Sequence, residues 1–127
     1  MFSNPKNSSS NVKIDTLIGA STNLTGNINS SGAIIIYGRF IGDIVTEGDV
    51  TIGSGAQING DITAANVIIS GNVEGNISCT GTLEIVPTGR LVGDVNVANL
   101  DIEKGAIFNG KCNVVSNNFL KLNEPAV

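Results

Sequence analysis

The feature that most constrains the fold is a repeat of about 17 residues that occurs six times along the chain. The motif Gly-[Asp/Asn/Lys]-[Ile/Val/Cys] begins at six glycines: Gly26, Gly42, Gly60, Gly75, Gly93 and Gly110. Six isoleucines follow the same period, with successive spacings of 18, 16, 17, 16 and 17 residues: Ile18, Ile36, Ile52, Ile69, Ile85 and Ile102. A unit this short cannot bury a core by itself, so we expect each repeat to stack on its neighbours.

The side chains that precede these isoleucines alternate with period two. Two residues before each isoleucine, the position is mostly aliphatic: Thr16, Ile34, Val50, Val67, Leu83 and Leu100. The position between is mixed and becomes polar toward the C-terminus: Leu17, Ile35, Thr51, Ile68, Glu84 and Asp101. This alternation predicts short strands, each with one buried face.

Three further columns follow the glycine motif. Apolar residues stand two positions before each glycine: Leu24, Phe40, Ile58, Val73, Leu91 and Phe108. A second apolar set stands two positions after it: Ile28, Ile44, Ile62, Ile77, Val95 and Cys112. Small side chains follow two residues later: Ser30, Thr46, Ala64, Cys79, Val97 and Val114. The columns predict an all-β solenoid of parallel strands, whose six coils at ~4.8 Å spacing form a rod of roughly 29 Å.

The motif glycines are expected at corners between the strands, where glycine permits a positive φ and a close backbone approach. Asp43, Asp61 and Asp94 stand next to three of them. Asp at such a position can hydrogen-bond the local backbone. We therefore assign these carboxylates to the corners and predict no metal site.

We predict one β-helix domain over residues 14–115 with a disordered tail on each side. Residues 1–13, MFSNPKNSSSNVK, are polar and rich in Ser and Asn, and they contain no apolar segment typical of a secretory signal. Residues 116–127 abandon the repeat and form the C-terminal tail.

The charge and the cysteines exclude several classes of function. The formal net charge of −4 argues against a nucleic-acid partner, because such a protein needs a basic surface to neutralise phosphates. Cys79 and Cys112 both fall in inward columns, which predicts buried, reduced thiols. We find no catalytic constellation and no cofactor motif.

An enzyme of the left-handed hexapeptide-repeat type is the main alternative. Ile52, Ile58 and Ala64 are spaced six apart, as in acyltransferases of that class, but the six-residue register fails elsewhere. Those enzymes use a histidine base, and this chain has no histidine. The loops are too short to form a cleft. Arg39 and Arg90 are interpreted as solvent-exposed side chains. A further alternative is a solenoid that binds a ligand or acts as an adaptor without polymerising.

The ends of a solenoid expose unpaired strand edges and an uncovered apolar layer. Phe108 lies in an inward column of the last repeat, and Phe119, Leu120 and Leu122 follow in the C-terminal tail. Two interpretations remain: the tail folds back over the end, or the ends of different molecules stack on one another.

The repeat resembles the bactofilins, a family of bacterial cytoskeletal proteins. The resemblance covers residues 14–115 and is most specific in the segments GRLVGDV and EKGAIFNGKC. It implies a right-handed parallel β-helix that forms nonpolar filaments by end-to-end contact without a nucleotide. It also implies that Phe108 lies in the polymer interface, and that the protein is a scaffold for cell shape, wall synthesis or motility.

Two sets of site residues follow from the open ends and from this resemblance. We expect the polymer interface to include six residues: Leu17, Ile18, Ile107, Phe108, Phe119 and Leu120. Bactofilins often carry an N-terminal membrane-targeting segment that begins with Met and Phe, and Met1, Phe2 and Lys6 match it. The expected partners are other copies of the chain, other bactofilins, wall or motility proteins, and the inner face of the cytoplasmic membrane.

Overall fold

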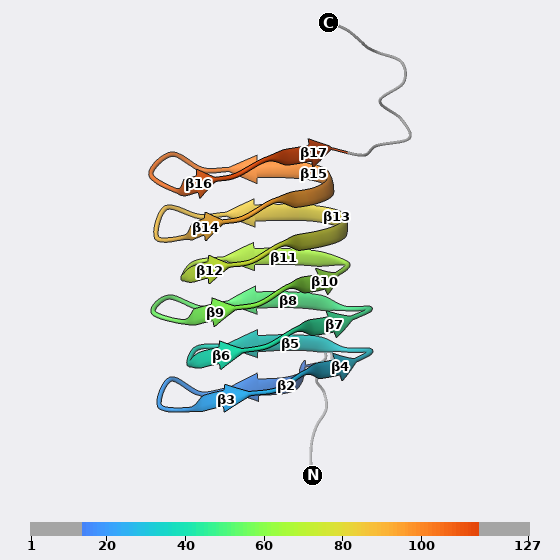
Figure 1. Cartoon of the computed structure of the whole chain (residues 1–127), viewed down its shortest axis with the longest axis vertical. Helices are drawn as coiled ribbons and strands as arrows, with labels where there is room; N and C mark the ends of the chain where they lie inside the picture. Colours follow the sequence, from blue (N-terminus) through green and yellow to red (C-terminus); the bar gives the residue numbers. More distant parts are fainter. Residues whose placement is uncertain (1–13, 115–127) are drawn as a thin grey trace, which may run out of the picture.

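The computed structural model describes residues 14–114, which form a solenoid of six coils with three strands in each coil (Figure 1). The strands stack into three walls, named A, B and C in the order in which the chain meets them. No helix in this part of the chain is long and apolar enough to cross a bilayer.

Each wall contains one strand segment from every coil. Wall A contains β2 (Ile14–Ile18), β5 (Ala33–Ile36), β8 (Asp49–Ile52), β11 (Asn66–Ile69), and the second halves of β13 (Ile77–Ile85) and β15 (Val95–Ile102). Wall B contains β3 (Asn23–Thr25), β6 (Arg39–Ile41), β9 (Gln57–Asn59), β12 (Asn72–Glu74), β14 (Arg90–Val92) and β16 (Ile107–Asn109). Wall C contains β4 (Ile28–Ser30), β7 (Ile44–Thr46), β10 (Ile62–Ala64), the first halves of β13 and β15, and β17 (Cys112–Val114).

The predicted columns are confirmed as parallel, in-register strands. On wall A, Ile18 pairs with Ile36 and Ile36 with Ile52, and the series continues to Ile102. On wall B the column that starts at Leu24 continues to Phe108 in the same way. Like residues therefore stack directly on like residues, which fixes the register of the coils.

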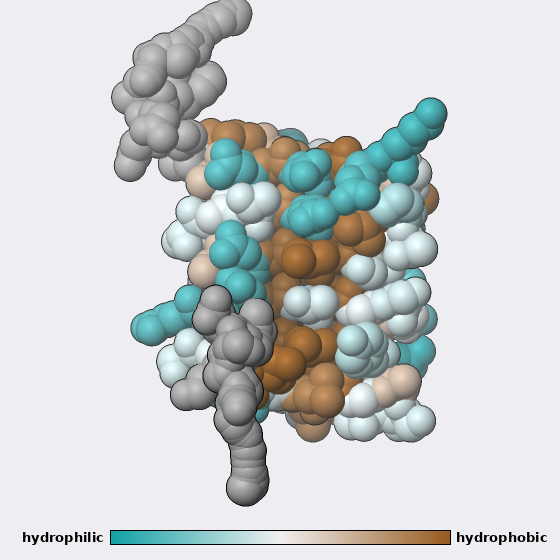
Figure 2. All heavy atoms as spheres, turned by 180° about the vertical axis from the view of Figure 1, so that it is seen from behind, coloured by the Kyte–Doolittle hydropathy of each residue, from teal (hydrophilic) through white to brown (hydrophobic). Residues whose placement is uncertain are grey.

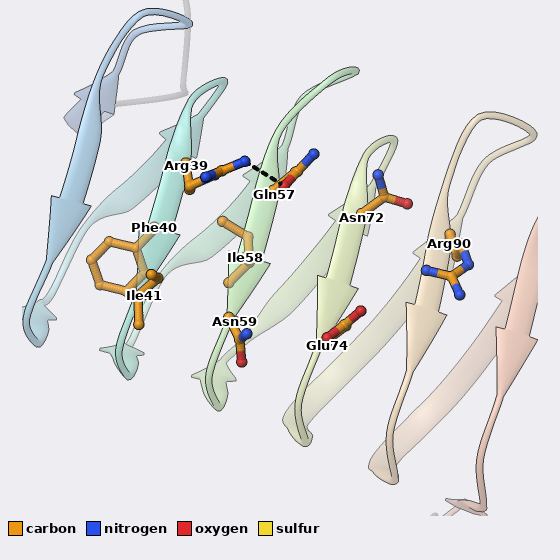
Figure 3. Close-up of a pocket in the computed structure, with 9 residues that line it drawn as sticks. All are labelled: Arg39, Phe40, Ile41, Gln57, Ile58, Asn59, Asn72, Glu74 and Arg90. Carbon is orange, nitrogen blue, oxygen red and sulfur yellow. Dashed lines mark hydrogen bonds between the residues drawn. The ribbon is translucent and has the colours of Figure 1, made fainter.

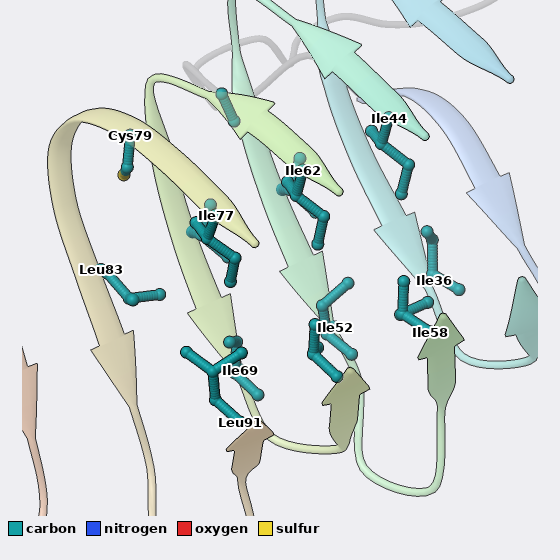
Figure 4. Close-up of a cluster of buried hydrophobic side chains, with 14 of the residues drawn as sticks. Ile36, Ile44, Ile52, Ile58, Ile62, Ile69, Ile77, Cys79, Leu83 and Leu91 are labelled. Atoms are coloured by element: carbon teal, nitrogen blue, oxygen red, sulfur yellow. The ribbon is translucent and has the colours of Figure 1, made fainter. Parts of the chain in front are cut away.

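The inward columns of the three walls form one continuous apolar core (Figure 4). Ile36, Ile52 and Ile69 on wall A face Ile44, Ile62 and Ile77 on wall C, and all six are fully buried. Burying one such side chain contributes about 1.5–3 kcal/mol. Because the interior coils repeat this arrangement, aliphatic ladders fill most of the core of a chain in which only 4% of the residues are aromatic.

The corner glycines meet two requirements at once. Gly60 and Gly75 both have φ of +150°, which residues with a side chain rarely adopt. A Cβ on Gly60 would also overlap the carbonyl oxygen of Gly42 in the preceding coil, and Gly75 is in the same position above Gly60. Stacking at this corner therefore depends on the absence of side chains.

A ladder of side-chain oxygens follows the glycines along the corner between walls B and C. The Oδ1 atom of Asp43 accepts the backbone N–H of Asp61 at 3.1 Å, and Oδ1 of Asp61 accepts that of Asn76 at 3.0 Å. Asn27 and Asp94 make the same bond to the coil that follows each of them. The corner carboxylates thus hydrogen-bond to the next coil, whereas the sequence predicted bonds to the backbone of their own turn.

The two thiols differ, contrary to prediction. Both cysteines are free; Cys79 is buried, whereas Cys112 is exposed. Cys112 occupies the inward column next to Val95, but no described coil covers it from the other side. The prediction of burial was therefore wrong for Cys112, since burial in a solenoid depends on having a neighbour on both sides.

Candidate functional site at the end coils

The two end coils present unpaired strand edges. Strands β3 and β4 pair only with β6 and β7, and β16 and β17 pair only with β14 and β15. Half of the backbone N–H and C=O groups of these end strands therefore point along the rod axis with no strand opposite them in residues 14–114. Edges of this kind are templates for pairing with another chain.

The C-terminal end exposes apolar side chains that would be core in any other coil. Phe108 is half-buried and packs against the core, in register with the fully buried Leu91 of the coil below. Ile102 is 42% exposed, although its counterpart Ile85 is fully buried. The end surface is therefore an apolar layer that lacks a covering coil among the described residues.

The N-terminal end exposes less of the isoleucine column than the C-terminal end does. Ile18 is only 5% exposed, so it offers little surface to a partner. Leu24 is 40% exposed, and its counterpart Phe40 in the next coil is fully buried. The two ends therefore use the same columns but present different side chains.

The corner ladder of oxygens ends at Lys111. The N–H of Lys111 is accepted by Oδ1 of Asp94 at 3.1 Å, but a lysine side chain carries only donors and cannot continue the ladder. At the other end Asn27 begins the ladder, and no described coil lies below it to accept its own N–H. The two ends are therefore not complementary at this corner.

The six residues expected in a polymer interface do not share one surface. Phe108 and Ile18 lie in inward columns of the two end coils. Ile107 is 52% exposed and aligns with Arg90, so it faces sideways on wall B. Leu17 is 62% exposed and faces sideways on wall A. Phe119 and Leu120, like the targeting residues Met1, Phe2 and Lys6, lie outside the described residues.

Wall B carries an open groove of about 410 Å³ that the sequence analysis missed (Figure 3). Arg39, Gln57, Asn72 and Arg90 follow one another along it in register, and Nη2 of Arg39 donates to Oε1 of Gln57 at 3.1 Å. Only the register brings the two arginines onto one line, so spacing alone did not reveal it. The groove contains no nucleophile paired with a base, and it therefore does not resemble a catalytic site.

The two cysteine thiols are the remaining candidate nucleophiles, and both are free. Burial raises the pKa of the Cys79 thiol, and desolvation also raises the pKa of Cys112. Both thiols are therefore less nucleophilic at neutral pH than an ordinary cysteine. In residues 14–114 no group of three or more His, Cys, Asp or Glu side chains is placed to hold a metal ion.

Self-similar coils that stack in register, with an apolar layer and unpaired strand edges at each end of residues 14–114, define the chain as a β-solenoid protein whose ends can accept further coils. The family model described as "Bactofilin: Polymer-forming cytoskeletal" matches residues 16–113, so the chain belongs to the bactofilin family, which is cytoskeletal rather than enzymatic.

A solved structure supports the same assignment. A cryo-EM reconstruction of Thermus thermophilus bactofilin double helical filaments superimposes with a TM-score of 0.75 at 25% sequence identity, covering 79% of this chain and 99% of that chain. A search of curated proteins gave no significant match.

Proposed function

We propose that this bactofilin is a cytoskeletal scaffold that polymerises end to end through its terminal coils, without a nucleotide. The observation that carries the proposal is the half-buried Phe108 on an end coil whose strands pair on one side only. Stacking a second end coil there would bury apolar surface and pair the free backbone groups. Neither gain requires chemical energy.

We further propose that like ends meet, which gives a nonpolar filament. In a head-to-tail contact the ladder would place the N–H of Asn27 over Lys111, whose side chain offers no acceptor. A contact between two C-terminal ends avoids this mismatch and is isologous, the commonest type of symmetric interface.

In this arrangement Phe108 lies within the interface between C-terminal ends, with Ile107 at its rim, while Leu17 and Ile18 belong to the contact between N-terminal ends. Phe119 and Leu120 of the C-terminal tail are included as flanking residues.

Electron microscopy of the purified full chain tests end-to-end assembly. We expect filaments from the wild type and none from Phe108→Arg, because a charged side chain would be buried without a partner. Ile41→Arg is the matched control: Ile41 is 47% exposed on wall B and faces sideways. A wild type that stays monomeric at high concentration, or a Phe108→Arg variant that forms normal filaments, would contradict the proposal.

The exposed thiol reports whether the C-terminal end coil is covered in the filament. If C-terminal ends are joined, Cys112 reacts with an alkylating reagent in the Phe108→Arg variant and becomes protected in wild-type filaments. Cys79 is buried in both states and serves as the internal control. The reaction is run at alkaline pH because the pKa of Cys112 is raised. Equal labelling of Cys112 in monomers and filaments would place the contact elsewhere.

We also propose that the N-terminal tail attaches the filament to the inner face of the cytoplasmic membrane through Met1, Phe2 and Lys6. One pair of apolar side chains contributes only a few kcal/mol, but a filament that displays many copies binds by avidity. Wild-type protein is expected to sediment with liposomes, and Phe2→Glu is expected to remain in the supernatant. Unchanged sedimentation of that variant would refute the assignment.

Two further steps rest on family likeness. Because the matched structure consists of double helical filaments, we propose that two strands of this protein wind around each other. As a membrane-attached polymer it would organise machinery for cell shape, wall synthesis or motility, and it would take other bactofilins or proteins of those machineries as partners.

A further inference from the structure

Wall A carries a largely aliphatic outward column that faces sideways, and only its first residue, Leu17, borders the proposed contact between N-terminal ends. This column consists of Leu17, Ile35, Thr51, Ile68, Glu84 and Asp101, one residue per coil and in register throughout. Leu17 is 62% exposed and Ile68 39% exposed. Figure 2 shows this face, with hydrophobic side chains along its middle and lower part and hydrophilic ones above. We name Leu17, Ile35, Tyr37, Thr51 and Ile68 the apolar stripe, and Glu84, Asp101 and Glu103 the acidic patch.

Strand formation does not explain the stripe. The same column accepts Glu84 and Asp101 in equally regular strands, so the wall does not need aliphatic side chains on its outside. A general preference of strands for aliphatic residues would also act on wall C. The outward column of wall C, however, contains one aliphatic residue among six: Asn29, Val45, Thr63, Ser78, Asn96 and Asn113.

Tyr37 widens the stripe and is held against the wall. It follows β5, and its ring lies over Gly53 of the next coil, where any Cβ would overlap the ring atoms. The Tyr37 side chain remains 44% exposed. A tyrosine placed in this way loses little conformational freedom on binding and offers an apolar ring with a polar edge, which is typical of anchors at protein interfaces.

We propose that the apolar stripe is the lateral contact between the two strands of the filament, and that its partner is wall A of a second copy of this chain. The inference rests on the proposed end-to-end assembly and places the two-fold axis of each contact through wall A, so that the stripe is repeated along one side of each strand. Parallel sheets twist, so the repeated stripe follows a helical path. Two strands that keep their stripes in contact must therefore wind around each other.

Contact between like ends determines where the apolar stripes and the acidic patches, and hence the lateral contacts, lie along each strand. Joined N-terminal ends unite two apolar stripes into a segment of eight coils, or roughly 38 Å. Joined C-terminal ends unite two acidic patches over four coils, or roughly 19 Å, where like charges repel a facing patch. Lateral contact is therefore centred on the N-terminal junctions. Each contact is small, and repetition along the filament supplies the avidity.

Cryo-EM of filaments from Ile68→Glu tests the inference. Glu84 stands at the equivalent position in the next coil, so the wall accommodates this side chain without loss of the fold. We expect single-stranded filaments with an unchanged axial repeat, and a fraction of paired strands lower by roughly tenfold or more, because a carboxylate would be buried in an apolar contact. Val45→Glu is the matched control, since Val45 is 45% exposed on wall C. It should keep the strands paired.

Each other outcome decides against the inference in a distinct way. Single-stranded wild-type filaments, or paired strands in Ile68→Glu, overturn the lateral contact and leave end-to-end assembly standing. If Ile68→Glu loses all filaments while Ile68→Thr, which repeats the side chain of Thr51, forms normal pairs, the stripe serves the ends and the lateral contact is refuted. If the strands of Ile68→Glu stay paired but the filaments no longer sediment with liposomes, the stripe binds lipid, and the lateral contact is refuted. The absence of any wild-type filament overturns the proposed function first, and this inference with it.

Discussion

The interior coils and the end coils use the same side-chain columns for different purposes. Phe40 in the second coil and Phe108 in the sixth occupy the same column of wall B, yet Phe40 is fully buried and Phe108 only half-buried. The residue type and its register are the same, and only the number of neighbouring coils differs. Burial in this fold is therefore a property of position in the stack, and the same aromatic ring stabilises the fold inside and offers a contact at the end.

The comparison also separates stability from assembly. An interior coil is held by a coil on each side, so substitutions there should lower the free energy of unfolding. An end coil is held on one side only, so a similar substitution should cost less in folding and more in polymerisation. Three measurements test this division, beginning with the largest expected effect.

Truncation of the two phenylalanines is the most direct test. Phe40→Ala should lower the free energy of unfolding by about 3–5 kcal/mol, because it leaves a cavity in a packed core. Phe108→Ala should lower it by about 1–2 kcal/mol, since half of the ring already faces solvent. Denaturant titration of dilute, unassembled protein measures both values, and filament yield should fall for Phe108→Ala. Equal losses of stability would show that the last coil is covered as well as the second.

The corner glycines provide a second matched pair. Gly60→Ala should lower the unfolding free energy by roughly 3 kcal/mol or more, because it combines an unfavourable φ with an overlap against Gly42. Gly26 has a similar φ of +139°, but no atom beyond its chain neighbours lies within 4 Å of the position that a Cβ would take. Gly26→Ala should lose only about 1–2 kcal/mol for the strained backbone. Thermal unfolding of the two variants isolates the cost of stacking, and a Gly26→Ala variant as unstable as Gly60→Ala would attribute the whole effect to φ.

The sequence predicted the stack well because its signals are local. Period-two alternation and the corner glycines specify which side chains point inward, and the columns pair as expected. The same alternation already placed Leu17 and Ile107 on outward positions, so their sideways orientation could have been inferred. Exposure at the ends was harder to predict, as Cys112 shows, because it depends on the absence of a neighbour. The apolar stripe was visible as a column, but it becomes a surface only when the coils are stacked.

The acidic patch provides the smallest and last test, at the boundary between the fifth coil and the end coil. The pKa of Glu84 is raised mainly by a hydrogen bond with Glu103, with smaller contributions from desolvation and from the charges of Glu103 and Asp101. Folding therefore favours the protonated form of Glu84, and the ionised Glu84 is repelled by Glu103 and Asp101 when the pH is above its raised pKa. The repulsion is relieved as the pH falls toward the ordinary value of 4.5.

We expect the wild-type unfolding midpoint to rise slightly when the pH is lowered from 7 toward that value, relative to Glu84→Gln, which removes the repulsion at both pH values. Glu74→Gln, on wall B, takes the same charge from outside the patch and should retain the wild-type pH dependence. Thermal melts of the three proteins at the two pH values measure the difference. If the unfolding midpoints of Glu84→Gln and wild type change identically with pH, the acidic patch does not destabilise the folded end coil. Its only remaining role is then the repulsion between strands.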